Sequence, residues 1–89
     1  MKKLATVVEV EGEGFESLLE ENVLVFGLNY IYTGKLVGVS STFIKIEGAR
    51  LVYETGPFSD QQYKDAQALP VSEWYIQTSA IESFGLAGK

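Results

Sequence analysis

The chain alternates short apolar, β-branched runs with glycine, which is typical of short strands that bend. The clearest runs follow residue 30, where Gly34 and Gly38 interrupt one run and Gly48 interrupts the next. Glycine inside a strand marks a bulge, a sharp bend or a close approach of two backbones. The pattern therefore predicts strands over 30–39 and 43–54, the second of them kinked at its glycine.

Before this pair, the pattern predicts a strand over 4–10 and then a short amphipathic helix over 15–22. Phe15 and Leu18 would share one face of that helix, among glutamates that favour its first turn. Residues 23–30 are apolar at both alternating sets of positions. We therefore expect a strand that is covered on both faces.

After the glycine-marked strands, residues 55–72 form a polar insert that begins near a Gly-Pro break. A serine that can cap a helix favours a short helix over 60–67 within it. Two short strands are predicted over 73–78 and 80–84. The last residues, 85–89, are expected to be a frayed tail.

The length of 89 residues bounds the chain to one domain. Five short, bent strands in so few residues favour a small, mainly β barrel with a short N-terminal helix. Closing the sheet in this way removes the unpaired edges that a flat sheet of this size would expose.

The composition removes the usual equipment of catalysis. The chain has no cysteine, which removes cysteine nucleophiles and thiolate metal sites, and no histidine, which removes the commonest general base and metal ligand. We expect no enzyme, no cofactor and no metal site. The Gly12-Glu-Gly14 turn superficially resembles a dinucleotide-binding turn, but the glutamates in and around it would repel a pyrophosphate. We interpret those glutamates as a solvated acidic face rather than a cation site.

The net charge of −5 opposes generic binding to a phosphate backbone. Glutamates crowd the first 21 residues, whereas Lys35, Lys45 and Arg50 lie in the glycine-marked part, so a local basic spot is compatible with the sequence. The apolar run after the first lysines is too short for a signal peptide, and no run approaches the length of a membrane span. We expect a cytoplasmic protein without a membrane partner.

Two segments carry a family resemblance. The first is Gly34-Lys35-Leu36-Val37-Gly38 with the apolar Val23-Leu24-Val25 before it, and the second is Tyr75-Ile76-Gln77-Thr78-Ser79-Ala80-Ile81. Over residues 22–54 and 73–84 the chain resembles the Sm-like family of small SH3-type barrels, which includes the bacterial Hfq proteins. Among them it looks closest to uncharacterised phage or environmental members.

The resemblance implies a homo-oligomeric ring of about five to seven subunits whose pore-side loops bind RNA or single-stranded nucleic acid. The chain departs from the family pattern at two turns. The family's aspartate falls on Ser40 or Ser41, and its Arg-Gly turn is replaced by Gln77-Thr78.

The strand after the first turn has two alternative registers. An alignment without gaps would point Lys45 and Glu47 into the barrel, where unpaired charge is costly. One inserted residue in the turn instead points Ile44 and Ile46 inward, since side chains alternate along a strand. We prefer the second register, in which Phe43 takes the position that stacks on a base in the family.

These positions define the candidate site residues. The candidate nucleic-acid contacts are Ser40, Ser41, Phe43, Lys45, Gln77 and Ser79. Stacking by an aromatic ring and phosphate contact by a lysine are the usual means of single-strand binding. The plain alternative is that Phe43 packs at a core edge and Lys45 is solvated.

A second set of positions suggests contacts between subunits. These candidates are Trp74, Tyr75, Ile76, Ile81 and Phe84, because aromatic residues are enriched at interfaces and an exposed final strand can add to a neighbouring sheet. The competing hypothesis is an oligomeric structural or adaptor protein that kept the ring, lost nucleic-acid binding and holds a protein partner.

Overall fold

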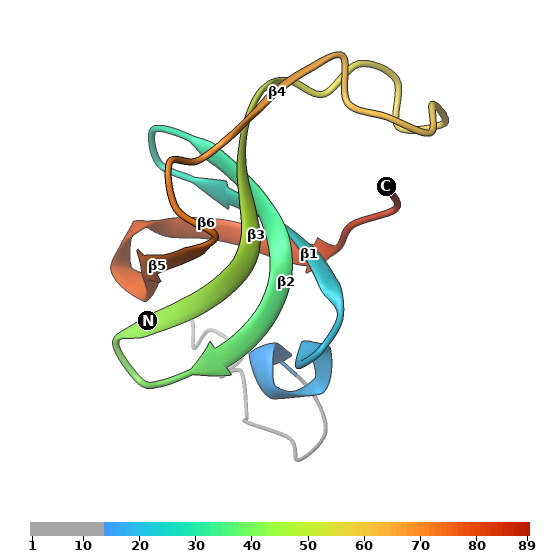
Figure 1. Ribbon diagram of the computed structural model, residues 1–89. Helices are drawn as coiled ribbons and strands as arrows, with labels where there is room; N and C mark the ends of the chain where they lie inside the picture. Colours follow the sequence, from blue (N-terminus) through green and yellow to red (C-terminus); the bar gives the residue numbers. More distant parts are fainter. Residues whose placement is uncertain (1–13) are drawn as a thin grey trace, which may run out of the picture.

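The computed structural model describes residues 14–89, which form one strongly bent antiparallel sheet (Figure 1). In chain order the elements are η1 (Gly14–Leu18), β1 (Asn22–Gly27), β2 (Ile31–Val39), β3 (Phe43–Glu54), β4 (Asp65–Ala68), β5 (Glu73–Gln77), η2 (Thr78–Ala80) and β6 (Ile81–Leu86). The strands lie in the order β4-β3-β2-β1-β6, and β5 also pairs with β3. The prediction of a mainly β protein with bent strands is confirmed.

The long strand β3 organises the sheet by pairing with two partners along the same edge. Its first half pairs with β5, from Phe43 opposite Gln77 to Glu47 opposite Glu73. Its second half pairs with β4, where Val52 lies opposite Ala66. The edge changes partner at the bend of β3.

Two glycines allow this bend. Gly48 has a φ of +64°, which side-chain-bearing residues rarely adopt, and it lies where two residues of β3 oppose one of β2. Gly34 lies opposite, on β2, and a Cβ atom there would come within 2.9 Å of the Glu47 carbonyl oxygen. The predicted kink at Gly48 is therefore a β-bulge, and Gly34 allows the two backbones to approach.

Apolar side chains form two clusters. The main cluster lies on the face of the sheet lined by β1, β2, β3 and β5 and contains Val23, Val25, Leu36, Ile44, Ile46, Ala49 and Ile76. The insert-side cluster contains Leu24, Val52 and Tyr63, with Phe26, Ile31, Ala66 and Ala87 packed against it. Because neighbours along β1 point to opposite faces, Leu24 belongs to one cluster and Val23 and Val25 to the other.

The N-terminal predictions are met in part. The predicted strand over 4–10 lies outside the described residues. The helix expected over 15–22 is a short 3-10 turn, η1, because Glu20 turns the chain with a φ of 71° and its N–H donates to the Leu36 carbonyl, 2.8 Å away. Phe15 and Leu18 nevertheless pack against the main cluster, as their spacing predicted.

The helix predicted over 60–67 is wrong. Residues 65–68 form β4 instead, because the second half of β3 offers an unpaired edge and Ala66 packs beneath it. The sheet therefore has six strands rather than five. The terminal segment is also not frayed: β6 continues to Leu86, and the Ala87 N–H donates to the Asn22 carbonyl, 2.9 Å away.

Candidate binding pocket and subunit surface

The turn between β2 and β3 is built around the hydroxyl of Ser40. Its Oγ accepts hydrogen bonds from the N–H groups of Thr42 and Phe43, at 3.3 and 3.1 Å, and donates one to the Phe43 carbonyl at 3.0 Å. A serine that satisfies backbone groups in this way fixes the turn. Ser40, a predicted nucleic-acid contact, is thus occupied in holding Phe43 in place.

This turn lies beside η2, although the two are far apart in the sequence. The Thr78 N–H donates to the Thr42 carbonyl at 2.9 Å, and the Thr78 hydroxyl donates to the Ser41 carbonyl at 3.3 Å. These contacts bring the end of β5 against the start of β3. The predicted residues from both segments therefore meet.

They meet around an open pocket of about 370 Å³, which we call the Phe43 pocket. It is lined by Ser41, Thr42, Phe43, Gln77, Thr78 and Ser79. Four of the six predicted contacts are among these residues. The sequence missed Thr42 and Thr78, although each is the chain neighbour of a predicted residue.

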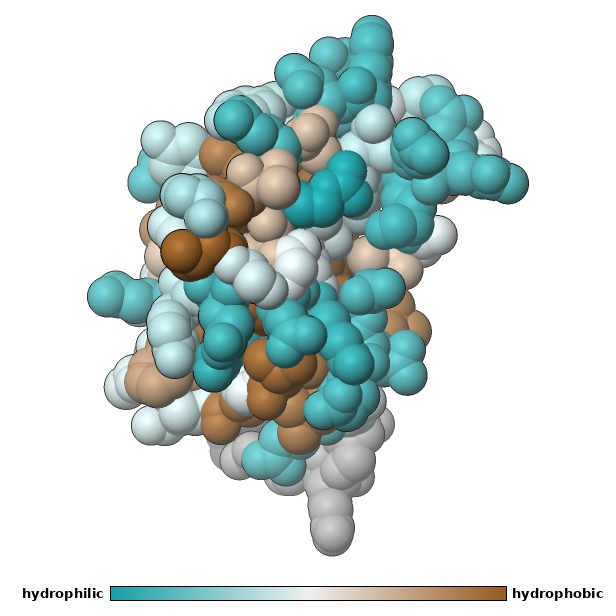
Figure 2. Space-filling model, in the orientation of Figure 1, coloured by the Kyte–Doolittle hydropathy of each residue, from teal (hydrophilic) through white to brown (hydrophobic). Residues whose placement is uncertain are grey.

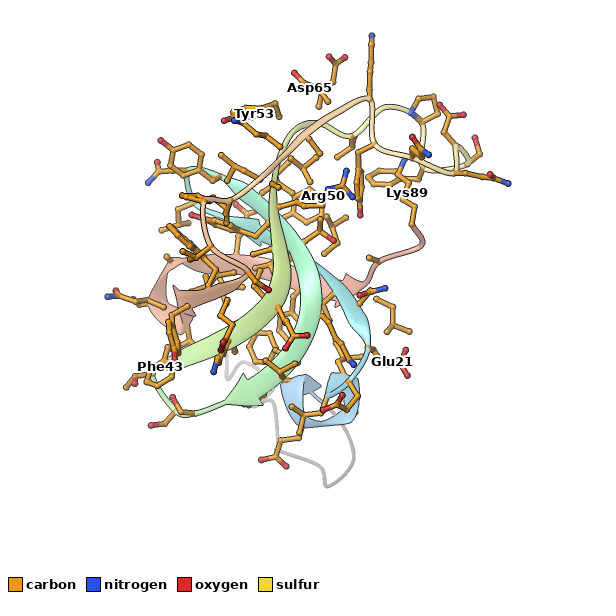
Figure 3. All side chains as sticks on the ribbon, viewed as in Figure 1. Glu21, Phe43, Arg50, Tyr53, Asp65 and Lys89 are labelled. Atoms are coloured by element: carbon orange, nitrogen blue, oxygen red, sulfur yellow. The ribbon has the colours of Figure 1, made fainter. Side chains whose placement is uncertain are left out.

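Phe43 lies on the outer face of the sheet, at the end opposite the insert (Figure 3). Ile44 and Ile46 are fully buried, whereas Phe43 is 41% exposed, so the prediction that the two isoleucines point inward is confirmed. The ring of Phe43 meets the ring of Tyr75 edge-on, with centroids 5.5 Å apart. Its other surroundings leave part of the ring accessible for stacking.

Lys45 lies next to the pocket but does not line it. Its ammonium forms an ion pair with the Glu73 carboxylate and lies 5.6 Å from the centre of the Tyr75 ring. The hydrogen bond to Glu73 raises the pKa of Lys45 above its ordinary value of 10.5, while partial desolvation opposes this shift. The carboxylate of Glu73 already neutralises the charge of Lys45 and weakens its attraction for a phosphate.

The other basic side chains also have neighbours. Three lysines pair with glutamates on the surface: Lys35 with Glu20 at 3.2 Å, Lys45 with Glu73, and Lys64 with Glu54 at 3.3 Å. Arg50 and Lys89 lie over the ring of Tyr63 at the opposite end of the sheet. Within residues 14–89, the Phe43 pocket therefore has no basic side chain of its own.

A second, smaller pocket of about 160 Å³ adjoins the first, with Gln77 lining both. Tyr30, Tyr32 and Tyr75 line it together with the turn that follows β1. Burial, and then the neighbouring Tyr30, raises the pKa of the Tyr32 hydroxyl above 10.0, so it stays a neutral hydrogen-bond donor near pH 7. Tyr30 and Tyr75 are more than half exposed, and they extend the aromatic surface that begins at Phe43.

The predicted subunit contacts lie in different environments. Tyr75 is 58% exposed on β5, and Phe84 is 38% exposed on β6, where it stacks on Phe15 with ring centroids 3.6 Å apart. Trp74 and Ile81 are half-buried against the main cluster. Ile76 is 4% exposed, so its side chain belongs to the core and only its backbone remains for a subunit contact.

The described residues form a small, mainly β, antiparallel sheet with a polar-aromatic pocket at one end. None of the helices among residues 14–89 is long and apolar enough to cross a membrane. The stretch with Gly12 and its neighbouring glutamates lies largely outside the described residues. No protein-family model matches the chain, and no curated protein or solved structure is significantly similar to it.

Proposed function

We propose that this protein is a self-assembling Sm-like module whose copies join through the outer edges of β5 and β6. The order of a helical turn, glycine-bent strands, a short strand, a second turn and a last strand supports this proposal, because it agrees with the family resemblance. Within residues 14–89, β5 pairs with β3 alone and β6 with β1 alone. Among these residues, each of the two strands thus keeps one free edge.

The observation that carries the proposal is the incomplete apolar face at β6. Phe84 lies opposite Val25 and Leu86 opposite Val23, so both side chains continue the main cluster beyond β1. Yet Phe84 is 38% exposed and Leu86 is 61% exposed, whereas the two valines are fully buried. A strand added at this edge would cover both.

The strand best suited to add there is β5 of a second copy. The free edge of β5 faces away from β3, whereas the free edge of β6 faces away from β1, so the two joining edges belong to different strands. Such a head-to-tail contact repeats from copy to copy and closes into a ring if the rotation permits. A ring of about five to seven copies is the assembly that we propose.

Light scattering of the purified protein at physiological salt tests this assembly. We expect a mass several times that of one chain, and we expect Leu86→Glu to reduce it by placing charge at the joined edge. Tyr53→Glu is the matched control, since Tyr53 is similarly exposed but lies on the insert side of β3. A monomeric wild-type protein would contradict the proposal.

Single-stranded RNA or DNA is a second candidate, as a ligand of the Phe43 pocket. The convergence of Ser41, Phe43, Gln77 and Ser79 on one pocket with an accessible ring favours it. The acidic net charge and the Lys45–Glu73 ion pair oppose it, because affinity for a single strand depends strongly on lysine and arginine side chains that are free to contact phosphates. We therefore rank nucleic-acid binding below assembly. If nucleic acid fails to bind, a protein partner is the ligand that we propose for the Phe43 pocket.

Fluorescence anisotropy with oligo-U, oligo-A and single-stranded DNA tests this candidate. If the pocket binds bases, Phe43→Ala should weaken binding by roughly tenfold, the loss of one stacked base. Glu73→Gln should strengthen binding by freeing Lys45, and Tyr53→Ala should change nothing. The absence of salt-sensitive binding at tens of micromolar protein would exclude the candidate and leave the assembly untouched.

A further inference from the structure

We propose that the start of the insert is a binding site for a primary alkylammonium group, and that Lys89 occupies it in this chain. The site, which we call the ammonium cage, is made by residues 55–63. It lies at the end of the sheet opposite the Phe43 pocket, within the insert loop, whose surface is largely hydrophilic in this view (Figures 1 and 2). It is independent of the function proposed above.

The Lys89 ammonium finds one acceptor for each of its three N–H donors. It donates to the carbonyl oxygens of Thr55, Pro57 and Gln62, at 3.0, 2.9 and 3.2 Å. Secondary ammonium groups have too few donors for this set, and quaternary ones have none. The donor count therefore selects a primary ammonium.

Aromatic rings supply the remaining stabilisation of the charge. The ammonium lies 4.8 Å from the centre of the Tyr63 ring and 5.7 Å from that of Phe58, both within the range of a cation–π contact. Within residues 14–89, no carboxylate lies close enough to Lys89 for an ion pair. The cage therefore recognises the cation through neutral dipoles and ring faces.

The backbone of the insert holds the cage by contacts that do not involve Lys89. The Lys64 N–H donates to the Thr55 carbonyl at 3.3 Å, and the Asp60 N–H donates to the Pro57 carbonyl at 3.0 Å. Each carbonyl has a second lone pair left for an ammonium. Tyr63, only 7% exposed, anchors the loop in the insert-side cluster.

The approach to the cage is open. Phe58 is 65% exposed, and Figure 3 shows Lys89 reaching the region from the C-terminal segment while Arg50 reaches it from β3. Because the cage is held by its own backbone, removal of the Lys89 side chain should leave it empty but formed. Another primary ammonium, such as a lysine side chain of a peptide, would then fit the same acceptors.

Chemical rescue of Lys89→Ala in the full chain tests the proposal. Amide resonances of residues 55–63 should shift in a saturable manner as n-butylammonium is added to this variant. Tetramethylammonium, which has no N–H, and potassium chloride at equal ionic strength should give no saturable shift. Lys64→Ala is the matched control, since Lys64 pairs with Glu54 instead, and neither it nor the wild-type protein should respond.

A measurement on the wild-type protein covers the case in which the variant loses the loop. Acetic anhydride should acetylate Lys89 about fivefold more slowly than Lys64, the factor that corresponds to roughly 1 kcal/mol of cation–π stabilisation. Equal acetylation rates at the two lysines would overturn the proposal. Equal responses of Lys89→Ala to butylammonium and tetramethylammonium would also overturn it.

Discussion

The two apolar clusters of this protein are built in different ways. The main cluster consists of aliphatic side chains from neighbouring strands, and five of them are completely buried. The insert-side cluster combines Leu24 of β1 and Val52 of β3 with Tyr63 of the insert, and Ala87 after β6 packs against it. The buried members of the main cluster are thus all strand residues, whereas the insert-side cluster also needs Tyr63 of the insert.

The buried polar groups on the insert-side face of the sheet are satisfied unevenly. Thr33, a buried polar residue opposite Leu24 on the insert-side face of the sheet, donates its hydroxyl to the Val23 carbonyl at 2.9 Å. The buried hydroxyl of Tyr63, in contrast, has no hydrogen-bond partner among the described residues. We infer that the main cluster carries most of the stability and that the insert-side cluster is the more adaptable of the two.

Truncation of one isoleucine or leucine compares the clusters most directly. We expect Ile46→Ala to reduce the free energy of unfolding by about 4 kcal/mol, because its rigid surroundings would keep the cavity. Leu24→Ala should cost about 2 kcal/mol, since the insert can close over the smaller side chain. Urea denaturation measures both, and equal losses would contradict the difference in adaptability.

Addition of one methyl group tests the two sides at a smaller scale. A Cβ atom at Gly34 would lie 2.9 Å from the Glu47 carbonyl and 3.3 Å from the Ile46 side chain, so Gly34→Ala should cost about 2 kcal/mol. Gly85 lies opposite Leu24 and has nothing within 4 Å of its added Cβ. Gly85→Ala should change thermal stability little, and a large loss there would show that the β6 edge is more crowded than the single chain indicates.

Removal of the Tyr63 hydroxyl should have a small effect of the opposite sign. Because this buried hydroxyl has no partner among residues 14–89, Tyr63→Phe should leave the free energy of unfolding unchanged or raise it by up to about 1 kcal/mol. Thr33→Val is the control on the same face of the sheet, since it removes a hydroxyl that does make a hydrogen bond. A clear destabilisation by Tyr63→Phe would reveal a partner for the hydroxyl.

The smallest effect should come from the exposed Lys45–Glu73 ion pair on the outer face of the sheet. The pKa of Lys45 is higher in the folded chain than its ordinary value of 10.5, so folding favours the protonated form. The stabilisation is complete below that value and is lost as the pH rises through the folded-state pKa. The difference in melting temperature between wild type and Lys45→Met should therefore shrink above about pH 10.5, and a constant difference up to pH 12 would contradict it.

The sequence by itself determined the strands that make the main cluster. Alternation placed Ile44 and Ile46 inside and Phe43 outside, since a shift of one residue would have buried Lys45. The glycine at position 48 likewise marked the bulge, because few other residues adopt its backbone conformation. These features depend on neighbours in the chain and on the two faces of a strand.

Only the tertiary structure decided the insert-side cluster and what lies around it. The capping serine favoured a helix over residues 60–67, and the free edge of β3 decided in favour of the strand β4 instead. The Lys45–Glu73 ion pair and the place of Lys89 in the ammonium cage join residues more than 25 positions apart. Such contacts leave no periodic pattern in the sequence, because they depend on where the folded sheet brings its two ends.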